Sequence, residues 1–323
     1  MNEFISSNSA RLDQILASYL SISRNQISEL IKSGNVYVND NLMLKPSFKV
    51  LLNDKIGFNL PKAKFKNCEF KADFDVEILY EDDDILVLNK PSNLTVHPAP
   101  SVKEATLVEW LKQNGYMLST LNGDIRAGIV HRLDKGTSGV IVVAKNNASH
   151  SALAAQLSDK SMGRVYLALI DFNLKDKLII DRPIGRNPQN RLKNSVAANG
   201  RAAKSAFTNI ICEDDLNLIA AKLFTGRTHQ IRVHLASINR HILGDNLYGF
   251  KSKNCKIKRV MLHAYILNLT HPKSGEKMQF IAPLPTDFYD ILSKKIDKEI
   301  LNEKIDPEFV SSAFYGFNEW MCL

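Results

Sequence analysis

The chain has little of what would mark it as secreted, rich in metal or embedded in a membrane. It contains 4 cysteines among 323 residues, at positions 68, 212, 255 and 322, and none belongs to a C-x-x-C pair. That spacing argues against a disulfide framework or a cysteine-rich zinc site and favours reduced thiols in a cytoplasmic protein. The opening MNEFISSNSARLDQ has no basic stretch before an apolar one, so no secretory signal is expected. The longest apolar runs, such as Val140–Ala144, have the length of a strand and cannot span a bilayer.

Two further absences narrow the chemistry. The sequence contains neither a regular β-α alternation with a Gly-rich phosphate loop nor an H-E-x-x-H pattern, so we expect no cofactor and no metal. The chain is, however, basic: Lys and Arg number 42, Asp and Glu number 34, and the formal net charge is +8. Such a surplus favours an anionic partner, which could be nucleic acid, a membrane surface or a phosphorylated ligand.

Length and pattern divide the chain into two parts. At roughly 150 residues per domain, 323 residues suggest two domains. Residues 1–72 have the pattern of a small α/β unit followed by a polar, basic linker from residue 61. This unit consists of an apolar stripe at helical spacing, a second helix that stops at Gly34 and short alternating strands.

Residues 73–323 change to many short strands mixed with helices. Strands are predicted over Ile85–Asn89, Val140–Ala144, Val165–Ile170 and Leu218–Phe224, and helices over Leu107–Leu111, Ala148–Leu157, Gly226–Leu235 and the stretch after about 286. Because strands and helices do not alternate regularly, we predict an α+β fold. Its larger unit should contain a mixed or antiparallel β-sheet with flanking helices, rather than a doubly wound sheet.

The stretch GIVHRLDKGTSGVIVVAK (128–145) is the most informative. Its two apolar, strand-like ends flank a loop that carries His131, Arg132 and Asp134, with glycines at the bends. Loops held between strands often carry functional side chains. An aspartate among basic neighbours would be kept ionised, as a nucleophile or a base requires. From the residues alone, a structural ion pair in a turn explains the same pattern equally well.

A second cluster is TGRTHQIRVH (225–234), at the start of a predicted helix after a strand. Thr225 could cap that helix, and Arg227 in its first turn could reach a phosphate or a carboxylate with two hydrogen bonds. His229 and His234 are five residues apart, about 140° around a helix, which is poor spacing for a shared metal.

The front segment SRNQISELIKSGNVYVNDNLMLKP (23–46) resembles the small RNA-binding module first described in ribosomal protein S-four. The shared features are S-R on the second helix, L-I-x-x-G at its end and V-x-V-N-D in the hairpin. The resemblance implies RNA contacts from basic and amide side chains, although a solvated helix face would have the same composition. The candidate RNA-binding residues are Arg11, Arg24, Gln26, Lys32, Asn35 and Lys45.

The larger unit resembles the RluA-type pseudouridine synthases. H-R-L-D-K-G-T-S-G-V-I-V-V-A-K (131–145) is similar to that family's signature, and T-G-R-T-H-Q-I-R-V-H-L (225–235) to its later arginine motif. Further blocks follow in family order, from the segment E-D-x-x-I-L-V-x-N-K-P through G-R-V-Y-L-A (163–168) to M-L-H-A. The likeness runs from about 77 to 285, and together the ordered blocks are highly specific.

The resemblance implies a reaction and roles for five residues. A pseudouridine synthase breaks the bond from the uracil nitrogen to the ribose, turns the base and rejoins it through carbon 5, without a cofactor. Asp134 would act at the ribose, by covalent attack or by helping a deprotonation at the 2′ position. Arg227 would pair with Asp134, and Tyr166 would stack on the uracil and could act as an acid or base. Arg132 would fill the gap left by the flipped uridine, and His131 would help to bind the substrate or hold the loop.

The expected substrate is large-subunit ribosomal RNA. V-H-P at 96–98 favours the members that modify a stem-loop of that RNA (RluD-like), with RluC-like members acting on other sites as the alternative. A non-catalytic, RNA-binding ribosome-assembly factor is a third possibility, disfavoured because Asp134, Tyr166 and Arg227 are all present. A glycoside hydrolase is disfavoured by the basic charge and the 2 tryptophans. We expect a monomer in the cytoplasm with no membrane partner.

Overall fold

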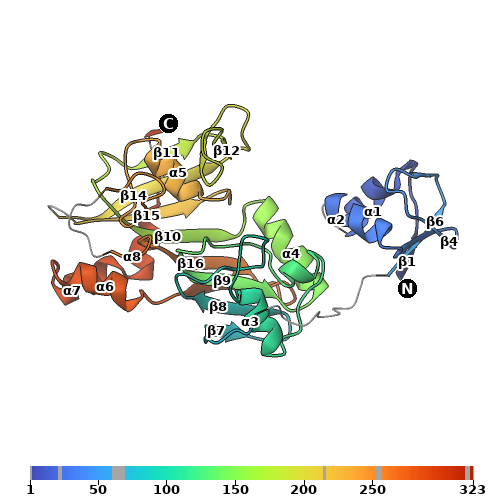
Figure 1. The fold of residues 1–323 in the computed structure, drawn as a ribbon, viewed down its shortest axis with the longest axis horizontal. Helices are drawn as coiled ribbons and strands as arrows, with labels where there is room; N and C mark the ends of the chain where they lie inside the picture. Colours follow the sequence, from blue (N-terminus) through green and yellow to red (C-terminus); the bar gives the residue numbers. More distant parts are fainter. Residues whose placement is uncertain are drawn as a thin grey trace.

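The computed structural model describes residues 2–20, 24–59, 70–213, 216–251, 257–316 and 321–322 (Figure 1). The side chains of residues 25, 26, 321 and 322 are outside this description, and so is most of the predicted linker. The RNA contact predicted for the Gln26 side chain therefore lies outside the described residues. In the part of the chain that is described, no helix is both long enough and apolar enough to cross a membrane.

The small unit, blue in Figure 1, packs two helices against short strands. Its sheet has the order β1-β6-β3-β4, and β2 pairs with β5. The elements are β1 (Asn2–Ile5), β2 (Ala10–Arg11), α1 (Leu12–Leu20), α2 (Arg24–Lys32), β3 (Val36–Val38), β4 (Asn41–Leu42), β5 (Lys49–Val50) and β6 (Lys55–Phe58). Leu12 and Leu16 of α1 and Ile27 and Ile31 of α2 are buried together, as helical spacing of apolar residues requires.

The large unit is built on one sheet that contains ten strands. In chain order its first elements are β7 (Glu77–Glu81), β8 (Ile85–Lys90), α3 (Leu107–Gln113), the 3-10 helix Asp124–Arg126, β9 (Ser138–Ala144), α4 (Asn147–Ser158), β10 (Gly163–Ile170), β11 (Leu178–Asp181), β12 (Ile184–Arg186) and β13 (Asn194–Val196). The remaining elements are β14 (Lys204–Glu213), β15 (Leu216–Leu223), α5 (Gln230–Ala236), β16 (Leu262–Thr270), β17 (Lys277–Ile281), α6 (Thr286–Ser293), α7 (Lys298–Lys304), α8 (Pro307–Ser312) and β18 (Met321–Cys322).

The sheet is mixed and mainly antiparallel, as predicted. The strand order is β18-β11-β14-β15-β10-β16-β9-β8-β7, with β17 also paired to β16. The pairs β9–β16 and β11–β18 are parallel, and the others are antiparallel. Gly139 makes the β9–β16 contact possible: a side chain there would lie 2.1 Å from the Ala264 carbonyl oxygen. This close approach joins the two halves of the sheet.

The central strands lie in the middle of a continuous apolar core. Every residue of β9 is buried, and so are the last seven of the eight residues of β10. A strand covered on both faces has a nearly unbroken apolar sequence, which explains the runs IVVA and VYLALI. Helix α4 packs on β9 and β16, and α5 packs on β13 and β14. The ends of β9, β10 and β15 thereby hold the loops that form the site.

Candidate active site

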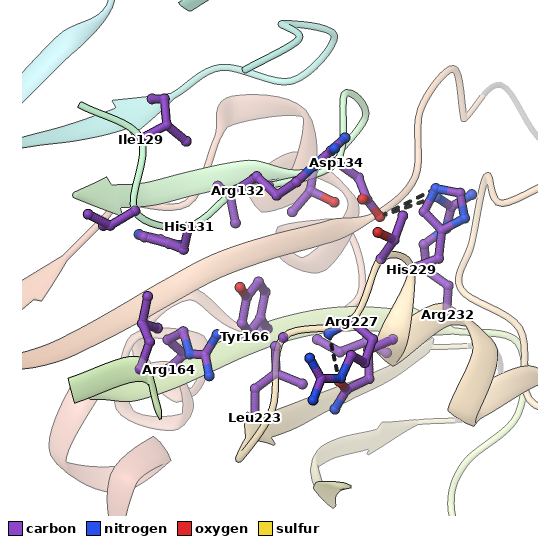
Figure 2. Close-up of a pocket in the computed structure, with 18 of the residues that line it drawn as sticks. Ile129, His131, Arg132, Asp134, Arg164, Tyr166, Leu223, Arg227, His229 and Arg232 are labelled. Atoms are coloured by element: carbon purple, nitrogen blue, oxygen red, sulfur yellow. Dashed lines mark hydrogen bonds and ion pairs between the residues drawn. The ribbon is translucent and has the colours of Figure 1, made fainter. Parts of the chain in front are cut away.

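A cavity of about 480 Å³ opens between the loop before β9, the strands β10 and β15, and the start of α5 (Figure 2). Among its lining residues, Asp134 is the one carboxylate. Six arginines also line it, namely Arg126, Arg132, Arg164, Arg201, Arg227 and Arg232. The cavity is therefore suited to a polyanion, with a single acidic group available for chemistry.

Asp134 lies in a loop that is fastened to β9. The Asp134 carbonyl accepts a hydrogen bond from the Thr137 N–H at 3.0 Å, which closes a turn just before the strand. Upstream, Nε2 of His131 accepts a hydrogen bond from the Val142 N–H at 3.1 Å. The loop is thus bound to the strand on both sides of Asp134, which fixes where its carboxylate points.

The carboxylate of Asp134 faces a buried guanidinium. Arg232 donates from Nε and Nη2 to the two oxygens of Asp245, at 2.7 and 2.9 Å, and its Nη1 lies 3.3 Å from Asp134 Oδ2. Burial alone would lower the pKa of Arg232, but its hydrogen bonds to Asp245 and the charges of both aspartates raise that pKa overall. Tyr248 covers the guanidinium, with its ring centre 4.9 Å from Cζ. Arg232 is therefore a fixed, charged support for Asp134.

The predicted pairing of Arg227 with Asp134 is wrong. Arg227 donates from Nε to the Ala202 carbonyl at 2.9 Å, and Arg232 occupies the position that was expected for Arg227. The reason is that α5 begins at Gln230 rather than at Gly226, and its N-cap residue is His229, in the left-handed region at φ 61°. Thr225 therefore does not cap the helix, and Arg227 lies in a turn that leads into it (Figure 2).

The side-chain amide of Gln230 shapes that turn. Its oxygen accepts from the Thr225 hydroxyl at 2.8 Å and from the Arg227 N–H at 2.9 Å. Its nitrogen donates to the Lys204 carbonyl and the Ser205 hydroxyl on β14. His234 also has a structural position, because its ring lies between the Ser205 hydroxyl and the Arg182 carbonyl. Of the charged or titratable side chains in this motif, Arg227, His229 and Arg232 line the cavity.

Tyr166 and Arg164 extend into the cavity from β10. The two residues alternate with Val165, so both side chains lie on the same face of the strand. Burial raises the pKa of Tyr166 to about 12, against an opposing effect from Arg164, so the phenol is neutral at physiological pH. Asp134 lies on the other side of the cavity in Figure 2. A planar base could therefore lie on Tyr166 with its ribose toward Asp134.

The histidines around the cavity are neutral groups. Burial, with a further contribution from Arg164, lowers the pKa of His131 to about 3. Burial also lowers the pKa of His97 and of His229, although the charge of Asp134 opposes the shift at His229. Arg132 is exposed, and its Nη1 lies 3.3 Å from Nε2 of His97. The positive charge of the cavity at neutral pH therefore comes from arginine.

Lys90 is fully buried behind the Asp134 loop. Its ammonium lies 2.8 Å from the Pro91 carbonyl, 2.9 Å from that of Leu94 and 3.4 Å from that of Lys135. Burial lowers the pKa of Lys90 to about 7, although the charge of Asp134 acts in the opposite direction. One amine thus connects the segment after β8 to the residue that follows Asp134.

Sequence reasoning missed Arg232, Asp245 and Lys90. Arg232 lies in the motif TGRTHQIRVH. A helix that starts at Gln230 directs its side chain toward the cavity. Lys90 lies in the N-K-P block. A lysine within an apolar strand is unusual, and its position there indicates a buried amine. Asp245 follows Gly244, whose φ of 77° makes a turn at which a side chain would lie 1.9 Å from the Arg259 carbonyl oxygen. This glycine is the one local sequence feature that marks Asp245 as the partner of Arg232.

The predicted RNA-binding residues of the small unit lie on or near its surface. Arg11 and Arg24 both bind the carboxylate of Asp13, which is buried, at 2.9 and 3.0 Å. The side chain of Lys32 is 60% exposed and lies 3.8 Å from Glu29. Lys45 is exposed, and the Asn35 amide donates to the Ser33 hydroxyl and carbonyl. RNA contacts by these residues stay predictions.

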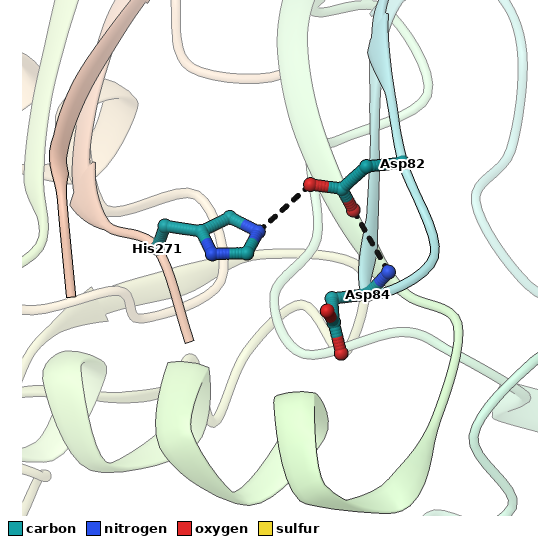
Figure 3. Close-up of side chains that lie close together, drawn as sticks. All are labelled: Asp82, Asp84 and His271. Atoms are coloured by element: carbon teal, nitrogen blue, oxygen red, sulfur yellow. Dashed lines mark hydrogen bonds and ion pairs between the residues drawn. The ribbon is translucent and has the colours of Figure 1, made fainter. Parts of the chain in front are cut away.

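One group in the described ranges brings three side chains of metal-ligating type together, namely Asp82, Asp84 and His271 (Figure 3). The ring Nδ1 of His271 accepts from the N–H groups of Lys273 and Ser274, so Nε2 carries the proton and donates to Asp82 at 2.8 Å. Neither ring nitrogen then offers a lone pair to a metal.

The two aspartates of that group are also hydrogen-bonded. Oδ1 of Asp82 accepts from two backbone N–H groups, and its Oδ2 accepts from the Tyr80 hydroxyl as well as from His271. Oδ1 of Asp84 accepts from Asn146 and Ser149 at the start of α4. The cluster therefore fastens β7, β8, α4 and the end of β16 to one another, and we assign it a structural role.

Comparison with known proteins finds two family models that match separate parts of the chain. The family model described as RNA pseudouridylate synthase matches residues 84–237, and the S4 domain model matches residues 10–56. The chain is 47% identical over 312 residues to "Uncharacterized RNA pseudouridine synthase" of Helicobacter pylori strain J99, covering 94% of this chain and 95% of that protein. It is 37% identical over 289 residues to "Ribosomal large subunit pseudouridine synthase D" of Zymomonas mobilis, covering 86% and 91%.

Solved structures share the fold of the large unit. "Human RNA Pseudouridylate Synthase Domain Containing 4" superposes with a TM-score of 0.54 at 22% identity, covering 68% of this chain and 92% of that chain. "Human RNA Pseudouridylate Synthase Domain Containing 1" gives a TM-score of 0.51 at 22% identity, with 68% and 94% covered. At these identities the likeness concerns the fold alone.

Proposed function

Because the chain belongs to the RNA pseudouridine synthase family, we propose that it converts specific uridines of large-subunit ribosomal RNA to pseudouridine, with Asp134 acting at the ribose. The observation that carries this assignment is the position of Asp134, 3.3 Å from a buried arginine in a cavity lined by six arginines. The Zymomonas mobilis relative, whose name refers to the ribosomal large subunit, and the match to the S4 domain support this choice of RNA.

The chemistry assigned to Asp134 is limited to the sugar. The bond from C1′ to N1 breaks, the base turns, and a bond from C1′ to C5 forms, while the proton on C5 is lost and N1 gains one. Asp134 either attacks C1′ or takes the proton at C2′, and both routes need a carboxylate held at a fixed position. Arg232 holds it, because its own bonds to Asp245 keep the guanidinium in place.

The other side chains bind the flipped nucleotide and its neighbours. Tyr166 would stack on the uracil, and its raised pKa favours stacking or proton donation over action as a phenolate base. Arg132, which is exposed at the cavity, would occupy the gap left in the RNA, and Arg227 would contact its backbone. His131 keeps the loop in place and contributes to the wall of the site.

Replacement of the carboxylate tests the assignment. We expect Asp134→Asn to lower single-turnover conversion of a ribosomal stem-loop by at least about 10⁴-fold, as loss of a covalent nucleophile does in other enzymes. Binding of the RNA should survive. Asp83→Asn, which removes an exposed carboxylate outside the cavity, is the matched control and should convert normally. Undiminished pseudouridine formation by Asp134→Asn would overturn the role of Asp134.

The substrate is tested separately. Carbodiimide-dependent primer extension on ribosomal RNA, from cells with and without the gene, maps the uridines that depend on this protein. Loss of pseudouridine from a stem-loop of the large-subunit RNA supports the RluD-like assignment, and loss at other sites of that RNA supports the RluC-like one. If no site changes while the protein still binds ribosomal RNA, the assembly-factor alternative replaces the enzymatic proposal.

A further inference from the structure

Arg164 is a buried cation with no partner in the described parts of the chain. Its side chain makes no hydrogen bond or ion pair there, and the residue is only 6% exposed. Its Nε is both buried and unsatisfied. The cavity's other deeply buried guanidinium, Arg232, is in contrast held by two carboxylates. A buried charge without a partner lowers stability, so its presence calls for a ligand that supplies the partner.

The backbone around Arg164 leaves room for the guanidinium to enter the cavity. A side chain added at Gly226 would lie 2.8 Å from Nη1 of Arg164, so the guanidinium rests against a residue that has no Cβ. Tyr166, two residues along β10, extends into the same cavity from the same face of the strand (Figure 2). Arg164 is thus at the deep edge of the surface on which we place the base, while Arg126 and Arg201 are exposed where a phosphate would pass.

We propose that the guanidinium of Arg164 binds a carbonyl oxygen of the uracil and stabilises the base as an anion while it is detached from the ribose. This inference rests on the proposed function and deepens it. When the C1′–N1 bond breaks, its electron pair stays on the base and spreads over N1, O2 and O4. That holds whether Asp134 bonds to C1′ or takes the 2′ proton. A planar guanidinium can donate to such an oxygen, with charge assisting the hydrogen bond.

An equilibrium measurement tests the anion site without any RNA. The probe is 5-nitrouracil, whose nitro group makes its ring N–H acidic, so that it is an anion at mildly alkaline pH. We expect calorimetric titration to show at least about tenfold weaker binding to Arg164→Met than to the wild-type chain, since a charge-assisted bond is lost. Asp134→Ala, which removes the facing negative charge, should bind at least as tightly as wild type. Equal binding by wild type and Arg164→Met would overturn the inference, whether or not ribosomal RNA proves to be the substrate.

Kinetics then test the role in the reaction. Arg164→Met should lower single-turnover conversion of the stem-loop by about 10²- to 10³-fold, the usual cost of losing one donor to a developing anion. With 5-fluorouridine at the target position the base leaves more easily, so the loss in C1′–N1 cleavage should be at least about tenfold smaller. The same loss on both substrates would contradict a role at the leaving base. Lys222→Met, on the opposite face of the sheet beside Val165, is the control and should convert normally.

Stability separates this role from a structural one. Arg164→Met removes a buried, unpartnered charge, so its thermal midpoint should equal or exceed that of wild type. A lower midpoint would mean that Arg164 supports the fold and would overturn the inference. Gly226→Ala provides a second variant, because it keeps the charge and displaces the guanidinium. It should reduce binding of 5-nitrouracil in the same direction as Arg164→Met, and unchanged binding would count against the proposed position.

Discussion

The small and the large unit each contain a cluster of arginine and aspartate, and the two clusters have opposite arrangements. In the small unit the buried group is the carboxylate of Asp13, which accepts hydrogen bonds from Arg11 and Arg24. The arginine side chains are 47% and 53% exposed. The carboxylate is occupied by its partners, whereas about half of each arginine side chain is accessible to solvent. A phosphate can approach them without breaking the cluster.

In the large unit the buried group is the cation. Arg232 is held by Asp245 through two short bonds and touches Asp134 through one longer contact of 3.3 Å. Asp245 is fully buried, whereas Asp134 is partly exposed to the cavity. In both clusters the buried groups are fixed by their partners, and the more exposed member is the one that a ligand can reach. In the small unit that member is the arginine pair for which we predict phosphate contacts, and in the large unit it is the carboxylate to which we assign the chemistry.

The largest effect is expected where the buried pair is broken. Asp245→Ala leaves Arg232 buried with only its longer contact, and should lower the free energy of unfolding by about 3–5 kcal/mol. Because Arg232 is then free to move, conversion should fall by about 10²-fold as well. Urea unfolding and single-turnover assays measure the two effects. Asp287→Ala, which removes the two-bond partner of another buried arginine, should destabilise the chain with a far smaller loss of rate. Equal losses of rate in Asp245→Ala and Asp287→Ala would show that Arg232 has no special role in positioning Asp134.

A smaller, pH-dependent effect is expected at Asp13. Hydrogen bonds from Arg11 first, and then from Arg24, lower the pKa of Asp13 to about 2, against the opposing effect of burial. The folded-state pKa lies below the unfolded value near 3.8, so this stabilisation is present above about pH 4 and is lost as pH falls toward 2. Because both arginines are exposed and screened, we expect about 1–2 kcal/mol. Amide hydrogen exchange in α1 should show a wild-type advantage over Asp13→Asn that shrinks as pH falls from about 5 to about 2. An advantage independent of pH would refute this explanation.

The smallest effect is expected when the exposed arginines are neutralised together. The double variant Arg11→Gln/Arg24→Gln should weaken binding of ribosomal RNA a few-fold and make its log–log salt dependence shallower by about 2, one unit per lost phosphate contact. The rate at saturating stem-loop should not change. Lys160→Gln/Lys298→Gln removes the same charge from the surface of the large unit and is the matched control. A salt slope that stays the same in the first variant would remove Arg11 and Arg24 from the RNA-binding surface.

The fold was largely predictable because its elements have strong local patterns. The apolar runs at 85–90 and 138–144 are central strands, and the helices at 107–113 and 147–158 have clear amphipathic or capped sequences. Ordered motifs also placed Asp134 and Tyr166 in one site, and the cavity brings both together. These features are determined by residues that are close together in the sequence, so sequence patterns are sufficient to predict them.

The partner of Asp134 could not be chosen correctly from the motif alone. Arg227 and Arg232 are both in TGRTHQIRVH, and Thr225, which follows a predicted strand, has the side chain of an N-cap residue. The start is instead set by Gln230, whose amide binds β14, a strand about 25 residues earlier in the chain. Asp245, thirteen residues after Arg232, completes the choice. Both determinants are tertiary contacts, which no local propensity encodes.

The buried amine of Lys90 has a consequence for how RNA must enter. Since it bridges carbonyls on both sides of the site, the residue next to Asp134 and the segment leading to His97 move as one piece. The wall around the carboxylate is therefore already assembled before any nucleotide arrives. We therefore expect the RNA, rather than this part of the protein, to deform on binding, which would favour uridines in weakly stacked, easily opened loops.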